Sequence, residues 1–390
     1  MGDDVELTAQ ERKPAARGGR LLALDGLRAF AVVTVMLFHL YAQPAISWKP
    51  WKPSGGFLTL DIFYVLSGFL ITSLLLAESD RCGSVNLRSF YARRALRLFP
   101  ALAILLLAAG VGAAVWSSQP WSKPTLLGLP WVILYVGNWN VIFYGGAIPL
   151  GALGQTWSLG VEEQFYLIWP LILLVVLRRF TNRLRIAAVL MAIAIGEMLY
   201  RFVAVEALHW VARDRCYFGT DTHSDGLLVG CSLAFFIAAQ RGRPPLSERF
   251  HRIVAWLTAF SVIALVLLIM RESYVAPSAV WFGISAAVLC TGVIVLNLVT
   301  RPLPVLAWVL ESRPVVWVGK RSYGIYLWQN TFAFFTSGIS HPGIGFNEWQ
   351  AIRFLVPIAI AAVSYRFVER PFLRRKRSFE RTKLVPSALV

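Results

Sequence analysis

The 390-residue chain is too apolar for a soluble protein, since 57% of its residues are hydrophobic and only 15% are charged, whereas soluble domains carry about 25% charged residues. Its formal net charge of +17 comes from short Lys and Arg clusters between apolar segments, which argues against a nucleic-acid-binding surface. The cysteines, Cys82, Cys216, Cys231 and Cys290, have no C-x-x-C spacing. We therefore expect neither a metal site nor a disulfide framework.

The chain begins with a polar segment, residues 1–20, which lacks the apolar core and cleavage site of a signal peptide. We predict that it is a disordered cytoplasmic tail. From residue 21 onward, apolar stretches of about 20 residues, the length that crosses a bilayer, follow one another. The ten predicted transmembrane helices cover residues 21–42, 57–78, 97–116, 160–178, 186–206, 221–240, 251–270, 278–299, 322–339 and 350–370. A basic cytoplasmic tail, 376–390, would follow a single membrane domain, 21–375.

An eleventh apolar stretch, 126–144, is interrupted by helix breakers and amides. These residues are Pro130, Gly137, Asn138, Asn140 and Gly145. If this stretch crossed the membrane, every later basic cluster would lie outside, against the positive-inside rule. We therefore predict an all-α integral membrane protein with about ten transmembrane helices, both termini cytoplasmic, and a re-entrant or surface segment near 126–144.

Ionisable residues inside the predicted helices are candidates for function, because charge in a bilayer is costly. His39 lies eleven residues after Arg28, about 16.5 Å further along a helix and within roughly 20° of the same face. Asp61 and the Glu162/Glu163 pair are expected at a depth similar to that of His39.

Several of these residues also have a structural interpretation. A deep histidine can serve as a hydrogen-bond partner between helices. Glu197 and Arg201, four residues apart, are most simply a structural salt bridge. Asp221 and Asp225 share a face at the start of a predicted helix and could be helix caps.

Seven segments, in order, resemble the membrane acyltransferase-3 family, and together they extend over about residues 21–375. They are LDGLRAF at 24–30 followed by His39, DIFYVLSGFLI at 61–71, YARRALRLFP at 91–100, QTWSLGVEEQFY at 155–166, TDTHSDGLLVG at 220–230, SYGIYL at 322–327 and SYRFVERP at 364–371. The resemblance implies a multi-pass protein of the bacterial cell membrane. It also implies a cytoplasmic acyl-CoA donor, acetyl-CoA by family analogy, and O-acylation of a sugar or similar hydroxyl.

Two positions depart from the family pattern. Gln329 stands where relatives often carry a histidine, and His223 stands where many carry an arginine. Glutamine can form hydrogen bonds but cannot exchange a proton near neutral pH. A second proton-relay histidine is therefore not available in the helix predicted over 322–339.

An acyl transfer from a thioester to an alcohol needs a base for the hydroxyl proton. We predict His39 as that base, oriented by a carboxylate, with catalytic candidates His39, Asp61, Glu162 and Glu163. CoA phosphates suit Arg and Lys side chains, which gives Arg28, Arg93, Arg94, Arg97, Lys320 and Arg321 as donor-binding candidates. The acceptor-binding candidates are Trp157, Tyr166, Trp210, Asp221, Asp225 and Tyr326. No permanently bound cofactor is expected, since acyl-CoA is a co-substrate.

Three alternatives for function stay open. The acceptor could be a cell-envelope carbohydrate or glycolipid, which would enter from outside, or a small glycosylated metabolite such as a macrolide. A proton-coupled transporter would also bury ionisable residues, but no internal repeat is visible. The polar residues instead divide into an inner cationic group and an outer acidic group, as a two-substrate enzyme requires. The bilayer, acyl-CoA and the acceptor are the expected partners, with no nucleic acid and an open oligomeric state.

Overall fold

The computed structural model describes residues 16–41, 53–144, 150–207, 209, 213–337 and 344–374, and within them all regular structure is helical. The α-helices are α1 (Ala16–Tyr41), α2 (Leu60–Cys82), α3 (Leu87–Val115), α4 (Ser122–Ile133), α5 (Gly137–Tyr144), α6 (Trp157–Arg179), α7 (Arg183–Arg201), α8 (Arg213–Phe218), α9 (Asp225–Ala239), α10 (Glu248–Arg271), α11 (Ile284–Thr300), α12 (Pro304–Leu310), α13 (Arg313–Gly319), α14 (Ser322–Phe335) and α15 (Phe346–Ser364). Short 3-10 or π-helical segments are η1 (Gly56–Thr59), η2 (Gly151–Thr156), η3 (Phe202–Ala207), η4 (Ala279–Gly283) and η5 (Tyr365–Glu369).

Eight segments of the described chain are long and apolar enough to cross a membrane. They are Leu22–Leu40, Gly56–Cys82, Leu87–Val115, Gly151–Arg179, Arg183–Ala207, Glu248–Arg271, Ala279–Thr300 and Glu348–Arg374. Each overlaps one of the ten predicted helices, although Leu87–Val115 and Gly151–Arg179 begin about ten residues earlier than predicted. In the described part of the predicted tails, α1 already begins at Ala16, whereas residues 1–15 and 375–390 lie outside the described residues.

The other two predicted spans correspond to shorter helices, so eight of the about ten predicted spans have the length and composition to cross a membrane in the described chain. Instead of 221–240 the structure has α9, with 15 residues, and instead of 322–339 it has α14, with 14 residues. At 1.5 Å per residue these helices are about 22 and 21 Å long, against a hydrocarbon core of about 30 Å. Polar residues set these limits, because Asp221–Ser224 form a turn before α9 and Thr336 caps the end of α14.

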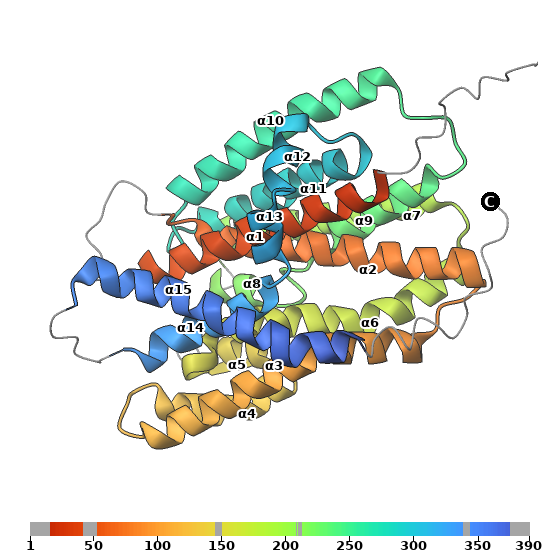
Figure 1. Cartoon of the computed structure of the whole chain (residues 1–390). Coiled ribbons are helices and arrows are strands. Elements are labelled where there is room, and N and C mark those ends of the chain that lie inside the picture. Colours follow the sequence, from red (N-terminus) through yellow and green to blue (C-terminus); the bar gives the residue numbers. More distant parts are fainter. Residues whose placement is uncertain are drawn as a thin grey trace, which may run out of the picture.

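The stretch 126–144 forms two short helices, α4 and α5, rather than one transmembrane helix (Figure 1). Between them, Tyr135 has a φ of 56°, which breaks the helix. Asn138 of the segment is bound within the protein, because its Nδ2 donates to Phe218 O, and Gln164 Nε2 of α6 donates to Tyr135 O, whereas Asn140 Oδ1 is buried without a hydrogen-bond partner in the described structure. The break at Tyr135 and the amide of Asn138 therefore have the protein partners that polar groups at membrane depth require.

Helix α1 lies in the middle of the bundle and contacts α2, α11 to α15 and η1 (Figure 1). The basic loops meet at one end, where Asp80 at the end of α2 pairs with Arg183 and Arg241. Near the same end, Arg93 of α3 pairs with Glu78. The positively charged loops after α2, α6 and α9 thus lie on one side of the bundle, as expected from their composition.

Helices α2 and α9 pack closely through two glycines. A Cβ on Gly68 would lie 2.0 Å from Leu227 O, and a Cβ on Gly230 would lie 2.2 Å from Val65 O. Both atoms are backbone, so neither can move without shifting a helix. Small residues at such an interface allow the close contact that stabilises helix pairs in membranes.

We expect Gly230→Ala to destabilise the protein by about 1–3 kcal/mol, the cost of overpacking a tight core. Gly196→Ala in α7 is the matched control, because a Cβ there meets nothing within 4 Å and alanine favours a helix. Thermal unfolding of both variants in detergent measures the difference. Equal unfolding temperatures would show that the α2–α9 contact tolerates a methyl group.

Candidate active site

A cavity of about 80 Å³ lies between α1, α2, α3, α6 and α14, with room for several water molecules. Six of the predicted site residues line it: Arg28, Arg94, Arg97, Glu162, Tyr166 and Tyr326. Five helices far apart in the sequence therefore bring together three donor-binding candidates, one catalytic candidate and two acceptor-binding candidates. We call this space the first cavity.

The three arginines of the first cavity differ in their partners. Arg94 donates from Nη2 to Glu163 Oε1 at 3.0 Å and its guanidinium lies 3.3 Å from the ring centre of Tyr166. Arg28 Nη1 lies 3.6 Å from Asp25 Oδ1. Arg97 is exposed, and no carboxylate of the described residues lies within ion-pair distance of it. Arg97 is therefore a cation available to an anionic ligand.

Glu162 and Tyr326 face the first cavity with their polar groups held in place. Ser67 Oγ donates to Glu162 Oε1 at 2.6 Å. The Tyr326 hydroxyl donates to Gln155 O at 2.8 Å and lies 2.7 Å from Ser158 Oγ. These bonds connect α2, η2, α6 and α14, and they fix the wall of the cavity.

His39 lies outside the first cavity, against a small cavity of about 10 Å³ with Gln329 and Arg353. His39 Nδ1 is 3.0 Å from Gln329 Oε1, so the residue that departs from the family pattern is the direct partner of the histidine. Gln329 follows Tyr326 by three residues on α14, a rise of about 4.5 Å. The two cavities are therefore neighbours along the contact between α1 and α14.

Arg353 of α15 was missed by the sequence analysis. Its side chain is 7% exposed, with Nε donating to Thr336 Oγ1 at 3.2 Å and Nη2 to Ala333 O at 2.8 Å. No carboxylate of the described residues pairs with it. The sequence did contain a signal for this residue, because Arg353 lies inside the helix predicted over 350–370 and charged residues within a membrane mark functional sites.

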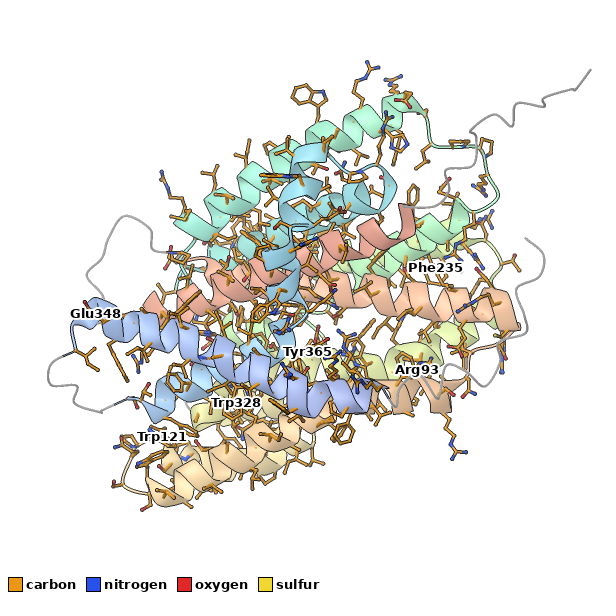
Figure 2. The ribbon with its side chains drawn as sticks, viewed as in Figure 1. Arg93, Trp121, Phe235, Trp328, Glu348 and Tyr365 are labelled. Carbon is orange, nitrogen blue, oxygen red and sulfur yellow. The ribbon has the colours of Figure 1, made fainter. Side chains whose placement is uncertain are left out.

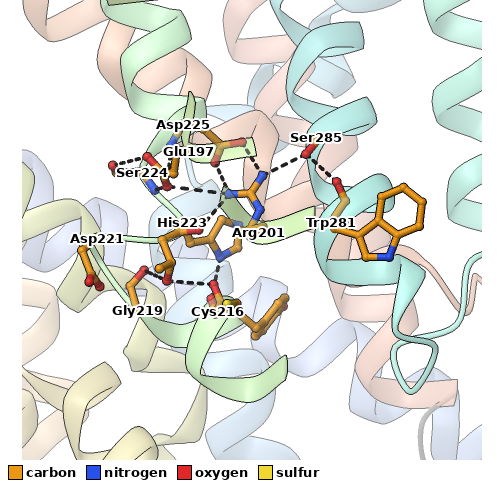
Figure 3. A network of polar contacts seen from close by, with 12 residues as sticks. Glu197, Arg201, Cys216, Gly219, Asp221, His223, Ser224, Asp225, Trp281 and Ser285 are labelled. Atoms are coloured by element: carbon orange, nitrogen blue, oxygen red, sulfur yellow. Dashed lines mark hydrogen bonds and ion pairs between the residues drawn. The ribbon is translucent and has the colours of Figure 1, made fainter. Parts of the chain in front are cut away.

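Asp61 and Asp225 belong to a buried polar network rather than to the first cavity, and Figure 3 shows Asp225 in this network with Arg201 and His223. Asp61 Oδ1 lies 3.0 Å from His223 Nε2. Arg201 binds Asp225 through two hydrogen bonds of 3.0 and 2.6 Å. Each of the four side chains is at most 1% exposed. We predicted that Asp61 would lie near His39, but in the described structure the imidazole partner of Asp61 is His223.

The expected pair of Glu197 and Arg201 is present in the same network, at 3.7 Å. Glu197 Oε1 also accepts from the backbone N–H of Ser224 at 2.6 Å. His223 Nδ1 lies 2.6 Å from Tyr217 O, so Nδ1 carries a proton and donates it. A second proton must then lie between His223 Nε2 and Asp61, because these atoms are at hydrogen-bond distance.

The remaining candidates lie at the edges of these sites. Asp221 accepts two hydrogen bonds from Arg215, at 3.0 and 2.7 Å. Partial burial raises the pKa of Asp221, but these bonds outweigh the effect, so its pKa lies below the ordinary value. Trp157 contacts the rings of Tyr217, Phe218 and His223 in tilted or edge-on arrangements, and Trp210 lies outside the described residues.

Lys320 and Arg321 line neither of these two cavities but a larger one of about 730 Å³ beside α15. Arg93, labelled in Figure 2, lies near the basic end of α3 and donates to Glu78 Oε2 at 3.0 Å. The predicted donor-binding residues therefore fall into three places. Only Arg28, Arg94 and Arg97 share a cavity with Glu162.

Comparison with known proteins now assigns the chain to a family. A family model described as an acyltransferase domain matches residues 21–365. The chain belongs to the acyltransferase-3 family. The peptidoglycan O-acetyltransferase OatA of Listeria monocytogenes is 34% identical over 370 residues, and the alignment covers 92% of this chain and 56% of that protein. The O-acetyltransferase OatA of Staphylococcus aureus is 32% identical over 385 residues, and this alignment covers 94% of this chain and 59% of that protein.

This acyltransferase-3 chain therefore spans little more than half the length of the curated relatives it matches. It is a multi-pass membrane protein with bacterial homologues. No solved structure matches it significantly. Among the described residues of the acyltransferase-3 domain, no group of three or more His, Cys, Asp or Glu side chains is arranged to hold a metal ion.

Proposed function

We propose that the protein is an O-acetyltransferase that moves an acetyl group from acetyl-CoA, bound at the basic end of the bundle, to a hydroxyl of the cell-wall glycan. The observation that carries this proposal is the first cavity, which brings three arginines together with Glu162 and two tyrosines between five helices. Relatives named peptidoglycan O-acetyltransferases support the carbohydrate acceptor.

The donor would enter where the basic loops lie. Arg97, which no described carboxylate pairs, and Arg28 would contact the phosphates of CoA, since guanidinium groups form forked hydrogen bonds with phosphate. Glu163 would position Arg94, to which it is bonded at 3.0 Å. Glu162 and Tyr326 would then line the space for the pantetheine arm and thioester.

His39 would act further along the same contact between helices. From Arg28 to His39 the rise along α1 is about 16.5 Å, which is comparable with the length of a pantetheine arm. His39 Nδ1 lies 3.0 Å from Gln329 Oε1 and 2.9 Å from Gln329 Nε2. In the tautomer in which Oε1 accepts the proton of Nδ1, the lone pair of Nε2 is free to accept the acceptor's hydroxyl proton. The alcohol oxygen then attacks the thioester carbon, the C–S bond breaks, and the thiolate takes the proton from His39.

The orientation follows from charge. We propose that the end with the basic loops faces the cytoplasm of a bacterial cell, so that both termini are cytoplasmic, as the positive-inside rule requires. The acceptor would reach the opposite end, where Tyr326 and Gln329 of α14 lead from the first cavity to His39. The acetyl group would cross the membrane while CoA stays on one side.

Acetyl transfer to a defined acceptor tests the function. The full chain in proteoliposomes is supplied with acetyl-CoA, and CoA release is measured with peptidoglycan fragments or with a glycosylated macrolide. We expect release that depends on the peptidoglycan fragment. If only the macrolide were acetylated, it would replace the cell-wall glycan as the acceptor in this proposal. Passage of a substrate across the membrane without CoA release would show that the protein is a transporter instead.

Donor binding depends on Arg97 in this proposal. We expect Arg97→Gln to raise the KM for acetyl-CoA roughly ten- to a hundredfold, since a hydrogen bond to a charged group contributes about 1.5–3 kcal/mol. Arg88→Gln is the matched control, because Arg88 is an exposed arginine of the same helix that does not line the first cavity. An unchanged KM in Arg97→Gln would place the phosphates elsewhere.

A further inference from the structure

The larger cavity beside α15, which we call the second cavity, is lined by four cations. Lys320 and Arg321 come from the turn between α13 and α14, and Arg366 and Arg370 from the end of the span Glu348–Arg374. No carboxylate of the described residues lies within ion-pair distance of any of the four. Four like charges around one open space of about 730 Å³ repel one another, so an anionic ligand would stabilise this cavity.

Arg321 is held in a fixed position. Its guanidinium lies 4.0 Å from the ring centre of Trp317 and 4.8 Å from that of Tyr365, and Nη1 donates to Trp317 O at 2.8 Å. Its Nε is buried and has no hydrogen-bond partner. A guanidinium placed in this way loses little freedom when it binds a phosphate.

Two acidic side chains, Asp25 and Glu369, lie near these cations, but Asp25 pairs with Arg28 instead. Glu369 is buried, and its Oε1 lies 3.3 Å from the position of a Cβ on Gly324 of α14. That carboxyl oxygen has no hydrogen-bond partner in the described structure. Glu369 therefore faces the interior of the bundle, and the positive charge of the second cavity remains available.

The depth of the second cavity corresponds to a membrane surface. The span Glu348–Arg374 has 27 residues, about 40 Å of helix, whereas the hydrocarbon core measures about 30 Å. Figure 2 shows Glu348 at the end of the bundle opposite Arg93, with Tyr365 further along the helix. Arg366 and Arg370 follow Glu348 by about 27 and 33 Å of helix, so they reach the level of the lipid headgroups when Glu348 lies at the opposite membrane surface.

Apolar side chains continue from these cations along the outside of the bundle. Val363 is 58% exposed and Phe367 is 68% exposed, and both line the second cavity. No residue lines both the first and the second cavity. An exposed apolar surface next to a cationic pocket suits acyl chains better than it suits a nucleotide.

We infer that the second cavity binds the phosphate headgroup of an anionic phospholipid, with its acyl chains along Val363 and Phe367. Cationic pockets between helices at a membrane surface recognise such headgroups. The phosphates of CoA share this chemistry, and Lys320 and Arg321 were predicted as donor-binding residues, so the test has an arm for each ligand.

Native mass spectrometry of the full chain in detergent measures retained phosphatidylglycerol, phosphatidylcholine and CoA. We expect retention of phosphatidylglycerol over phosphatidylcholine, and retention roughly thirtyfold weaker in R366Q/R370Q, about fivefold for each removed charge. R366K/R370K keeps both charges and should keep most of the binding, which excludes misfolding as the cause. Arg252→Gln, an exposed arginine of α10, is the control.

Two results would overturn this inference. Equal retention of phosphatidylglycerol and phosphatidylcholine would show that the cations do not select a headgroup. Retention of CoA that is lost in R366Q/R370Q, without the same loss of phosphatidylglycerol, would assign the second cavity to the donor. Neither result depends on acetyl transfer, so the proposed function is tested separately.

Discussion

His39→Ala is expected to lose acetyl transfer to the acceptor by a factor of about 10²–10⁴, the usual contribution of a positioned general base. Binding of acetyl-CoA should survive, because His39 lines the small cavity with Gln329 and Arg353 and not the first cavity. The measurement is acetylated product per enzyme, together with the affinity for acetyl-CoA of the same preparation.

His251→Ala is the matched control for this experiment. His251 is a partly buried histidine of α10 whose ring contacts Phe250, and it lines neither of the two cavities on the path from Arg28 to His39. His251→Ala should keep full transfer. Unchanged transfer in His39→Ala would remove the base from the proposal, whereas a parallel loss of acetyl-CoA binding would point to a folding defect.

Arg201→Met is expected to destabilise the protein by about 3–5 kcal/mol, because it leaves buried carboxylates without their cation. Arg201 is fully buried and binds Asp225 through two hydrogen bonds, with Glu197 at 3.7 Å. The network connects α7 to the start of α9, so its loss should also separate these helices. Thermal unfolding in detergent, with acetyl transfer after mild heating, measures the effect.

The double variant Arg201→Met/Asp225→Leu distinguishes charge from packing. Replacing both partners of a buried pair by apolar residues is often close to neutral, so the double variant should recover much of the stability lost in Arg201→Met. Arg185→Met is the control, since Arg185 is an exposed arginine at the start of α7. A double variant less stable than Arg201→Met would show that the shape of the ion pair matters more than its charge.

Relations within one helix could be predicted from the sequence. Arg28 and His39 were expected on one face of the first helix, and both line cavities that α14 also borders. The pair of Glu197 and Arg201 is present as its four-residue spacing indicates. These predictions depend only on helical periodicity, which is local.

Partners between helices could not be predicted in the same way. Asp61 was expected near His39 from its depth, but its imidazole partner is His223, which follows α8 in a turn. Depth along the membrane normal limits which residues share a layer and leaves open which neighbour each one meets. Arg353 was overlooked because a single charge in an apolar stretch gives no sign of what it faces.

The predicted lengths of α9 and α14 also differ from the observed lengths for a physical reason. Their apolar composition indicated full spans, but 15 and 14 residues suffice for helices whose sides are covered by other helices. A buried helix does not have to match the thickness of the lipid, because protein rather than hydrocarbon surrounds it. In α9 and α14 the high hydropathy therefore reflects burial within the protein and not exposure to lipid.

The short α14 changes the distance over which the membrane acts as a barrier. Its 14 residues give about 21 Å of helix, against about 30 Å of hydrocarbon. Water that reached both ends of α14 from opposite sides would therefore be separated by less than the thickness of the bilayer. Across a thinner layer the membrane potential falls more steeply, so a charge carried past Tyr326 and Gln329 would experience a stronger field than one crossing lipid.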